Sequence, residues 1–568
     1  MTTTLNRPIH ILLAMILLAG CTAPAEPEHF DVIVRGGDVY DGLGGPPQKA
    51  DVAIHGDRIA KIGDLSAATA EREVDASGLA VSPGFINMLS WATESLIEDG
   101  RGMSDIKQGV TLEVMGEGWS MGPVNDELRA LMKSQQVDIE YDITWSTLGE
   151  YLEFLENKGI SPNVASYVGA ATLRMLEVGF DNIRATDEQL ARMQDHVRVA
   201  MQEGAIGVGS SLIYAPGNFA NTDELVALMS AAAEFDGRYI SHIRSEGDRL
   251  EESVEELIHI ARVTGAPAEI YHLKASGQPN WHKLENVFAL IENAREEGLA
   301  ITADMYTYPA GATGLDASMP LWVQEGGDEA WFARLENPET RARVKAEMLS
   351  EDTDWENLGL HAGPDGILFI GFRNPALRHL IGKTLQEVAD MRGVEPVDAA
   401  IDLVIEDRSR VSTVYFLMSE DNVARKVAQP WMSFGSDAEA SAPEGVFLNS
   451  STHPRAYGTF TRVLGKYARD EGVITLQDAI RKMTSLPAAN IGIRERGQLT
   501  VGYFADIVVF DPATVQDHAT FAKPLQYATG VEHVFVNGEQ VLKDGEHTGA
   551  TPGRVVRGPG WTGWKDSG

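Results

Sequence analysis

Two histidines stand at the ends of short apolar runs, His242 in YISH and His272 in EIYH. Between them, residues 250–264 carry apolar side chains at helical spacing, with acidic residues on the other face. Strand, helix and strand over about thirty residues form one βα unit of a parallel sheet. Both histidines are therefore expected at the carboxyl ends of neighbouring strands, where βα barrels place their chemistry. Imidazoles on rigid strand ends suit a divalent metal such as zinc, and the alternative is a pair of structural histidines.

Length and charge narrow the class of protein. The chain has 568 residues, 43% of them hydrophobic, which excludes a disordered protein and indicates one large domain with one or two smaller ones. The formal net charge is −36, so the surface repels polyanions. Nucleic acid is therefore not an expected partner.

The amino terminus resembles a bacterial lipoprotein signal. Arg7 precedes an apolar run, residues 9–19, that is too short to span a bilayer. The run ends in LAGC at Cys21, the single cysteine of the sequence. The resemblance implies that residues 1–20 are a signal peptide, that Cys21 is lipidated and that residues 21–29 are a linker. The lipid would be the only membrane attachment, in the bacterial cell envelope, and Thr22 resembles the pattern sorted to the outer membrane, facing the periplasm.

The rest of the chain predicts an α/β protein. Segments 30–81 and 486–550 read as short strands with Gly-rich turns, which indicates a small β-sandwich domain built from both termini, or else two unrelated hairpins. Residues 82–485 alternate strand-like and helix-like stretches, as in a (β/α)8 TIM-like barrel. This rhythm breaks at about 320–380, which we interpret as an inserted subdomain, and 551–568 form a tail.

A series of phrases, in order from about residue 31 to 545, resembles one family. They include VIVRGGDVYDG, GVGSSLIYAPG, SHIRSEGDRL, YHLKASG, GSDAEA, HPRAYGTFTRVLG and GYFADIVVFDP. The chain is similar to the amidohydrolase superfamily and, within it, to the N-acyl-D-amino-acid deacylases (D-aminoacylases). The resemblance implies a metal-dependent hydrolase that cleaves the amide bond of an N-acylated D-amino acid.

The resemblance also assigns roles to four residues. Asp437, at the end of WMSFGSD, matches the family's strand-end aspartate, the general base that takes a proton from water. Arg455, in HPRAYG, matches the arginine that holds the substrate α-carboxylate. Lys274 and Tyr306 match positions that line the same pocket, although packing at the barrel rim would explain them equally well.

The metal site departs from the family pattern. Relatives have a His-x-His pair in GFIDxHxH, whereas this chain reads GFINMLSW, with Leu89 and Trp91 at those positions. The family's usual cysteine ligand is also missing, and Glu117 in GEGWS stands at or beside its place. We therefore predict that Glu117, His242 and His272 surround a single divalent metal, Zn²⁺, and that Trp91 and Trp119 fill the volume of a lost second metal. The alternative for Glu117 is an ordinary loop acid.

The sequence thus predicts an amidohydrolase whose partner is a small-molecule substrate. One alternative is a dipeptidase for short peptides with a D-residue, which would use nearly the same chemistry. An alternative from another class is a catalytically silent, ligand-binding lipoprotein, because the His-x-His pair is missing. The presence of His242, His272, Asp437 and Arg455 speaks against it, since a silent site has no need of all four.

Overall fold

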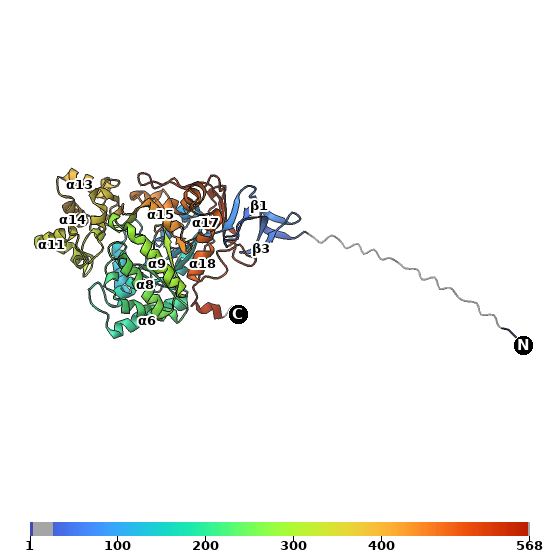
Figure 1. The fold of residues 1–568 in the computed structure, drawn as a ribbon, viewed down its shortest axis with the longest axis horizontal. Helices are drawn as coiled ribbons and strands as arrows, with labels where there is room; N and C mark the ends of the chain where they lie inside the picture. Colours follow the sequence, from blue (N-terminus) through green and yellow to red (C-terminus); the bar gives the residue numbers. More distant parts are fainter. Residues whose placement is uncertain (4–26, 566–568) are drawn as a thin grey trace.

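The computed structural model describes residues 1–3 and 27–565. Cys21 and most of the predicted signal peptide lie outside the described residues. Figure 1 shows a sheet carrying β1 and β3 at one end of the molecule, helices around a barrel in the middle, and a helical region with α11, α13 and α14 at the other end. Among the described residues, none of the helices is long and apolar enough to cross a bilayer.

The middle of the chain forms a closed barrel of parallel strands. β8 and β9 are separated by one residue and act as one strand. Counted in this way, the described part of the chain contributes eight strands to the barrel. Each pairs in parallel with its neighbour, and the backbone N–H of Met88 closes the ring by donating to Phe434 O at 3.1 Å. The strands are β6 (Phe85–Asn87), β7 (Val110–Met115), β8 (Asn163–Ser166), β9 (Val168–Gly169), β10 (Gly207–Ser211), β11 (Arg238–His242), β12 (Ala268–Ile270), β13 (Ile301–Met305) and β17 (Met432–Phe434).

Helices follow most of these strands, as the alternating sequence predicts. The predicted helix between the two histidines is α8 (Leu250–Thr264), and Gly265, with φ of 71°, ends it in the left-handed conformation that glycine adopts without strain. The apolar stripe of α8, which includes Leu257 and Ala261, is buried. The other helices around the barrel are α1 (Ser95–Glu98), α2 (Met103–Ile106), α3 (Asp126–Gln135), α4 (Leu148–Lys158), α5 (Ala170–Glu177), α6 (Asp187–Glu203), α7 (Thr222–Ala233), α9 (Leu284–Glu296), α15 (Glu420–Val427), α16 (Arg455–Arg462), α17 (Leu476–Met483) and α18 (Ser485–Ile491).

Both ends of the chain contribute strands to one nine-stranded sheet. The amino-terminal half meets the carboxyl-terminal half where β18 runs antiparallel to β5, with Val508 opposite Ser82. Apolar side chains leave both faces, since Val34 and Ile33 belong to different core clusters. The strand pairing shows that both ends of the chain form one sheet. The arrangement of this domain as a two-layer sandwich stays a prediction. The strands are β1 (His29–Val39), β2 (Gln48–His55), β3 (Arg58–Gly63), β4 (Thr69–Asp75), β5 (Ala80–Pro83), β18 (Ile507–Phe510), β19 (Val531–Val536), β20 (Glu539–Lys543) and β21 (Glu546–His547).

A region with its own core separates β13 from β17. Its three-stranded antiparallel sheet has the order β14–β16–β15, and its core cluster includes residues from Leu315 to Met418. It is wider than the insertion predicted at about 320–380, because the strands near its two ends pair with each other. Its elements are β14 (Gly311–Gly314), β15 (Ile367–Gly371), β16 (Ser412–Tyr415), α10 (Asp328–Glu336), α11 (Pro338–Met348), α12 (Leu358–Ala362), α13 (Leu385–Arg392) and α14 (Pro396–Asp407).

Candidate active site

The predicted site residues lie at the carboxyl ends of barrel strands. His242 is the last residue of β11, and His272 follows β12 by two residues. Glu117 follows β7 by two residues and Asp437 follows β17 by three. Because all barrel strands are parallel, their carboxyl ends meet on one face, and the four side chains come together there.

Two of these residues have a strained backbone. The φ angle is 33° at His272 and 50° at Asp437, in the left-handed region that costs a residue with a side chain about 1–3 kcal/mol. The surroundings hold both conformations. The backbone N–H of His272 donates to Asp304 Oδ1 at 2.9 Å, and that of Asp437 donates to the carbonyl oxygen of Leu89 at 2.8 Å. Such strain is typical of functional sites, where it aims a side chain that the regular strand would point elsewhere.

Glu117, His242 and His272 form a buried group of potential metal ligands. Glu117 Oε1 lies 2.8 Å from His242 Nδ1 and 2.9 Å from His272 Nε2. One potential ligand atom from each residue lies within 4.8 Å of the others, and none of the three side chains is more than 5% exposed. Burial raises the pKa of a carboxyl group, but His272 and His242 outweigh it and hold the pKa of Glu117 well below its usual range. Two imidazoles and an ionised carboxylate are a donor set that fits a catalytic divalent cation such as zinc.

Glu246, which was not among the residues predicted from sequence, contacts the outer side of both histidines. Its Oε1 lies 3.0 Å from His272 Nδ1, and its Oε2 lies 3.7 Å from His242 Nε2, a buried atom without a hydrogen-bond partner. At His272 a carboxylate beside Nδ1 helps to orient the ring with Nε2 toward Glu117, whereas the 3.7 Å distance to His242 is too long for a hydrogen bond. The only sequence signal is its place in SHIRSEGDRL, four residues after His242.

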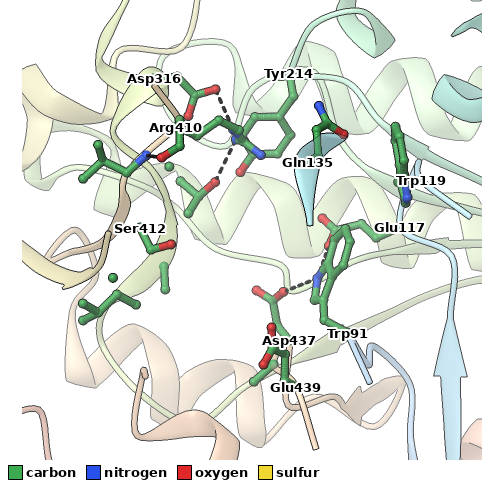
Figure 2. A pocket seen from close by; sticks show the side chains of 18 of the residues that line it. Trp91, Glu117, Trp119, Gln135, Tyr214, Asp316, Arg410, Ser412, Asp437 and Glu439 are labelled. Atoms are coloured by element: carbon green, nitrogen blue, oxygen red, sulfur yellow. Dashed lines mark hydrogen bonds and ion pairs between the residues drawn. The ribbon is translucent and has the colours of Figure 1, made fainter. Parts of the chain in front are cut away.

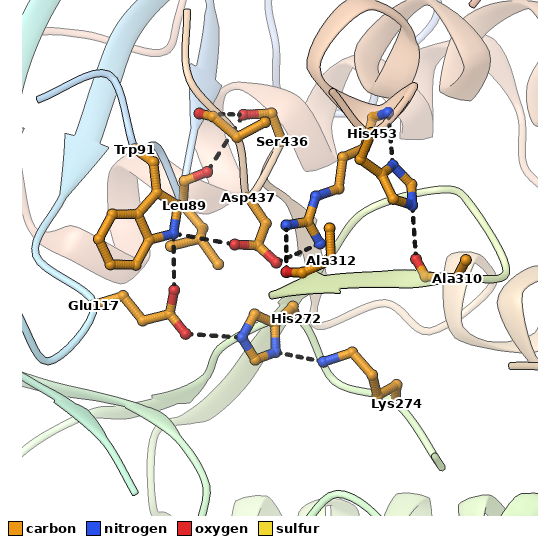
Figure 3. A network of polar contacts seen from close by, with 12 residues as sticks. Leu89, Trp91, Glu117, His272, Lys274, Ala310, Ala312, Ser436, Asp437 and His453 are labelled. Carbon is orange, nitrogen blue, oxygen red and sulfur yellow. Dashed lines mark hydrogen bonds and ion pairs between the residues drawn. The ribbon is translucent and has the colours of Figure 1, made fainter. Parts of the chain in front are cut away.

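Lys274 reaches the same carboxylate. Its Nζ forms a buried ion pair with Glu246. The same atom lies 2.7 Å from His272 Nδ1 (Figure 3). The side chain also lines the cavity, so the predicted contact with substrate stays a prediction. Lys274 also has a second role, because its ammonium group helps to hold Glu246 against the histidines.

Asp437 and Arg455, predicted as base and substrate anchor, form an ion pair. Arg455 Nη1 lies 2.6 Å from Asp437 Oδ2, and Nη2 donates to the carbonyl oxygen of Ala312 at 3.2 Å. The guanidinium carbon lies 4.6 Å from the centre of the Tyr306 ring. Burial raises the pKa of Asp437, Arg455 opposes this in part, and the Glu117 carboxylate adds to the rise. Arg455 is only 5% exposed, yet its Nε makes no hydrogen bond and its Nη1 meets Asp437 outside hydrogen-bond geometry.

Trp91 makes polar contacts that were not predicted from the sequence. Its indole N–H points to two carboxylates, with Nε1 3.0 Å from Glu117 Oε2 and 3.2 Å from Asp437 Oδ1 (Figure 2). The prediction that Trp91 only fills volume is therefore incomplete. Leu89 is fully buried and contributes its backbone carbonyl to Asp437.

A cavity of about 830 Å³ opens above these residues. Its floor includes the potential ligands and Asp437, and one wall comes from β14 and β16 of the inserted region. On that wall Arg410 pairs with Asp316 and lies over the Tyr214 ring (Figure 2). A cavity of this size suits a small molecule.

Comparison with known proteins places the chain in a family. Residues 375–542 match the amidohydrolase family. Over 535 residues the chain is 34% identical to D-aminoacylase from Alcaligenes xylosoxydans xylosoxydans, covering 94% of this chain and 98% of that protein. The chain belongs to the D-aminoacylase family of amidohydrolases. N-acyl-D-glutamate deacylase from the same organism is 33% identical over 531 residues, 93% of this chain and 97% of that protein.

A solved structure of the D-aminoacylase family has the same fold. N-acyl-D-glutamate deacylase from Bordetella bronchiseptica, complexed with zinc and a phosphonate inhibitor that mimics the tetrahedral intermediate, superimposes with a TM-score of 0.76. It is 32% identical, and the match covers 93% of this chain and 100% of that one. The barrel fold and the family resemblance predicted from sequence are thus confirmed.

Proposed function

We propose that the protein is a metal-dependent amidohydrolase that converts N-acyl-D-amino acids to a carboxylate and a free D-amino acid. The observation that carries this proposal is the buried group of Glu117, His242 and His272 beside the Asp437–Arg455 ion pair, on the floor of a cavity at the barrel's carboxyl face. The names of the curated relatives, D-aminoacylase and N-acyl-D-glutamate deacylase, support the substrate class.

Glu117, His242 and His272 would hold one divalent ion, which we propose to be Zn²⁺. When bound, such an ion activates water and polarises a carbonyl oxygen. Leu89 offers no ligand atom and the Trp91 indole offers only a donor hydrogen, so neither supplies ligands for a second ion.

Asp437 would act as the general base. Its carboxylate takes a proton from the attacking water and then gives it to the nitrogen of the departing amine, as an amide bond requires. Proton transfer by a positioned side chain typically contributes about 10²–10⁴-fold to the rate. The hydrogen bond from its backbone N–H to the carbonyl oxygen of Leu89 fixes the backbone that presents this carboxylate on the cavity floor.

Arg455 would hold the α-carboxylate of the substrate. Its Nη1 meets only Asp437, outside hydrogen-bond geometry, and its Nη2 donates to Ala312, so the edge formed by Nη1 and Nη2 can present two donors to a planar carboxylate. Tyr306 supports the guanidinium from one side. A bound substrate carboxylate would compete with Asp437 for Nη1, so substrate binding loosens the ion pair and leaves one oxygen of the base free for the proton.

A dipeptidase for D-residue-containing dipeptides is the second candidate, because a cavity of about 830 Å³ also accommodates a dipeptide. A hydrolysis screen of purified, zinc-loaded protein over N-acyl-D-amino acids, N-acyl-L-amino acids and dipeptides separates the two. Preference for N-acyl-D-amino acids supports the main proposal, and preference for dipeptides supports the second. Failure to retain zinc, together with absence of turnover, would support the catalytically silent lipoprotein.

We also propose, from the sequence alone, that Cys21 anchors the protein to the outer membrane by its lipid, facing the periplasm. Wild-type protein should then fractionate with membranes, and Cys21→Ser should abolish labelling by a radioactive or clickable fatty acid. An unlipidated wild-type protein with its first residues intact would contradict this proposal.

A further inference from the structure

We propose that Trp91 is a positioning residue of the reaction, whose single indole N–H holds the ligand Glu117 and the base Asp437 in a fixed relation. This inference rests on the proposed function. The indole nitrogen lies 3.0 Å from Glu117 Oε2 and 3.2 Å from Asp437 Oδ1 (Figure 3). These are not the oxygens that face the histidines and Arg455, which are Glu117 Oε1 and Asp437 Oδ2.

In each carboxylate, one oxygen accepts the hydrogen bond from Trp91 and the other oxygen stays available for the histidines or for the reaction. Trp91 takes Oε2 of Glu117 and leaves Oε1 directed at the two imidazoles. It also takes Oδ1 of Asp437, so the carboxylate cannot rotate freely about its last bond when Oδ2 changes partner. An indole is only a donor and stays neutral, so it attracts both carboxylates without competing as a base.

A hydrogen-bond donor is needed between Glu117 and Asp437, because these two acidic side chains are buried and lie close together. Glu117 is 5% exposed and Asp437 8%, so water screens their repulsion poorly. A shared N–H between them offsets part of that repulsion, as hydrogen bonds to ionised acceptors are stronger than neutral ones. An apolar ring system of the same size as the indole would fill the same space and leave both oxygens without this donor.

Arg455 cannot perform this task alone. It is the other side chain that holds Asp437, but it is also the proposed anchor for the substrate carboxylate. Once substrate engages Arg455, Trp91 remains as the contact that keeps Asp437 in place. Loss of the indole N–H should therefore affect the bound complex and lower kcat, with little change in KM.

The barrel itself fixes Trp91. Its backbone N–H donates to the carbonyl oxygen of Ala438 at 3.0 Å, the residue after Asp437, and Ser90 and Ala438 form a parallel bridge. These contacts lie beyond the carboxyl ends of the first and last barrel strands, and they set the indole against the base. The ring packs on a buried cluster that includes Met88 and Tyr167.

The test compares wild type with Trp91→Phe and with a matched control, Trp322→Phe. Trp322 also donates its indole N–H to a carboxylate, Glu347 Oε2 at 2.7 Å, but lies in the inserted region and outside the cavity lining. A second variant replaces the Trp91 indole by benzothiophene, which puts sulfur in place of the N–H and keeps the ring volume. For each protein, kcat and KM are measured on an N-acetyl-D-amino acid, and zinc affinity is measured by chelator competition with the metal-free protein.

Both Trp91 variants should lose about 10–150-fold in kcat, the range expected for hydrogen bonds to charged groups, with KM within about threefold of wild type. Zinc affinity should fall about 10–100-fold, as for other contacts that orient a metal ligand. Trp322→Phe should match wild type in both measurements. Wild-type kcat and zinc affinity in the benzothiophene variant would overturn the proposal and leave Trp91 as a volume-filling ring. If wild type hydrolyses no N-acyl-D-amino acid, the proposed function fails, while the zinc comparison still tests the contact with Glu117.

Discussion

Removal of the Arg455 guanidinium should abolish the preference of the enzyme for a free substrate carboxylate. Arg455 is 5% exposed, its Nε has no acceptor, and its Nη1 meets only Asp437, outside hydrogen-bond geometry. A substrate carboxylate at the edge formed by Nη1 and Nη2 would accept charge-assisted hydrogen bonds from this guanidinium. Such bonds are worth about 1.5–3 kcal/mol, which corresponds to about 10–150-fold in kcat/KM between an N-acyl-D-amino acid and its amide.

The assay is the ratio of kcat/KM for the acid and the matching amide in each variant. Wild type should favour the acid by the factor above. Arg455→Lys should keep part of the preference, because an ammonium cannot present two parallel donors. In Arg455→Ala the two substrates should become similarly poor. This variant also deprives Asp437 of its partner, but that loss affects both substrates alike and cancels in the ratio.

Arg410→Ala is the matched control, since Arg410 is another guanidinium of the cavity but is paired with Asp316. It should leave the acid-to-amide ratio near that of wild type. If instead the preference survives intact in Arg455→Ala, the carboxylate is held elsewhere and the reasoning is wrong. Lys274 would then be the next residue to test.

Three further predictions follow from the same site. Glu117→Gln should lower the zinc content of purified protein, measured by mass spectrometry, whereas the exposed Glu188→Gln should not; equal zinc in both variants would remove Glu117 from the site. Asp437→Asn should keep fold and zinc and lose at least about 10²-fold in kcat, and near-normal turnover would mean that another group moves the proton. Burial raises the pKa of Asp437 and Arg455 opposes this rise, so Arg455→Gln should raise the pKa of Asp437 further. Because the base works only when it is ionised, the acidic limb of the kcat–pH profile should then move to higher pH. A shift to lower pH would contradict the assignment of Asp437 as the base.

Local sequence patterns were sufficient to predict the barrel unit that carries the two histidines. The helix predicted between them matches α8, because helical periodicity and the glycine that ends the helix are local properties of the chain. The position of His242 and His272 on one face of the barrel could also be predicted, because parallel strands have their carboxyl ends at the same edge. The family resemblance then pointed to Glu117, which the structure places against both histidines.

Which donor contacts which carboxylate in the site depends on the tertiary structure and could not be predicted from the sequence. Trp91 and Asp437 are 346 residues apart in the sequence, and no local pattern indicates that the indole N–H of one reaches the carboxylate of the other. The same holds for the ion pair of Asp437 with Arg455, because spacing within a helix or strand predicts which face a side chain leaves from but not which atom it meets across the barrel. Those partners are set by closure of the barrel, which brings the first and last strands together and so determines which buried donor serves which carboxylate.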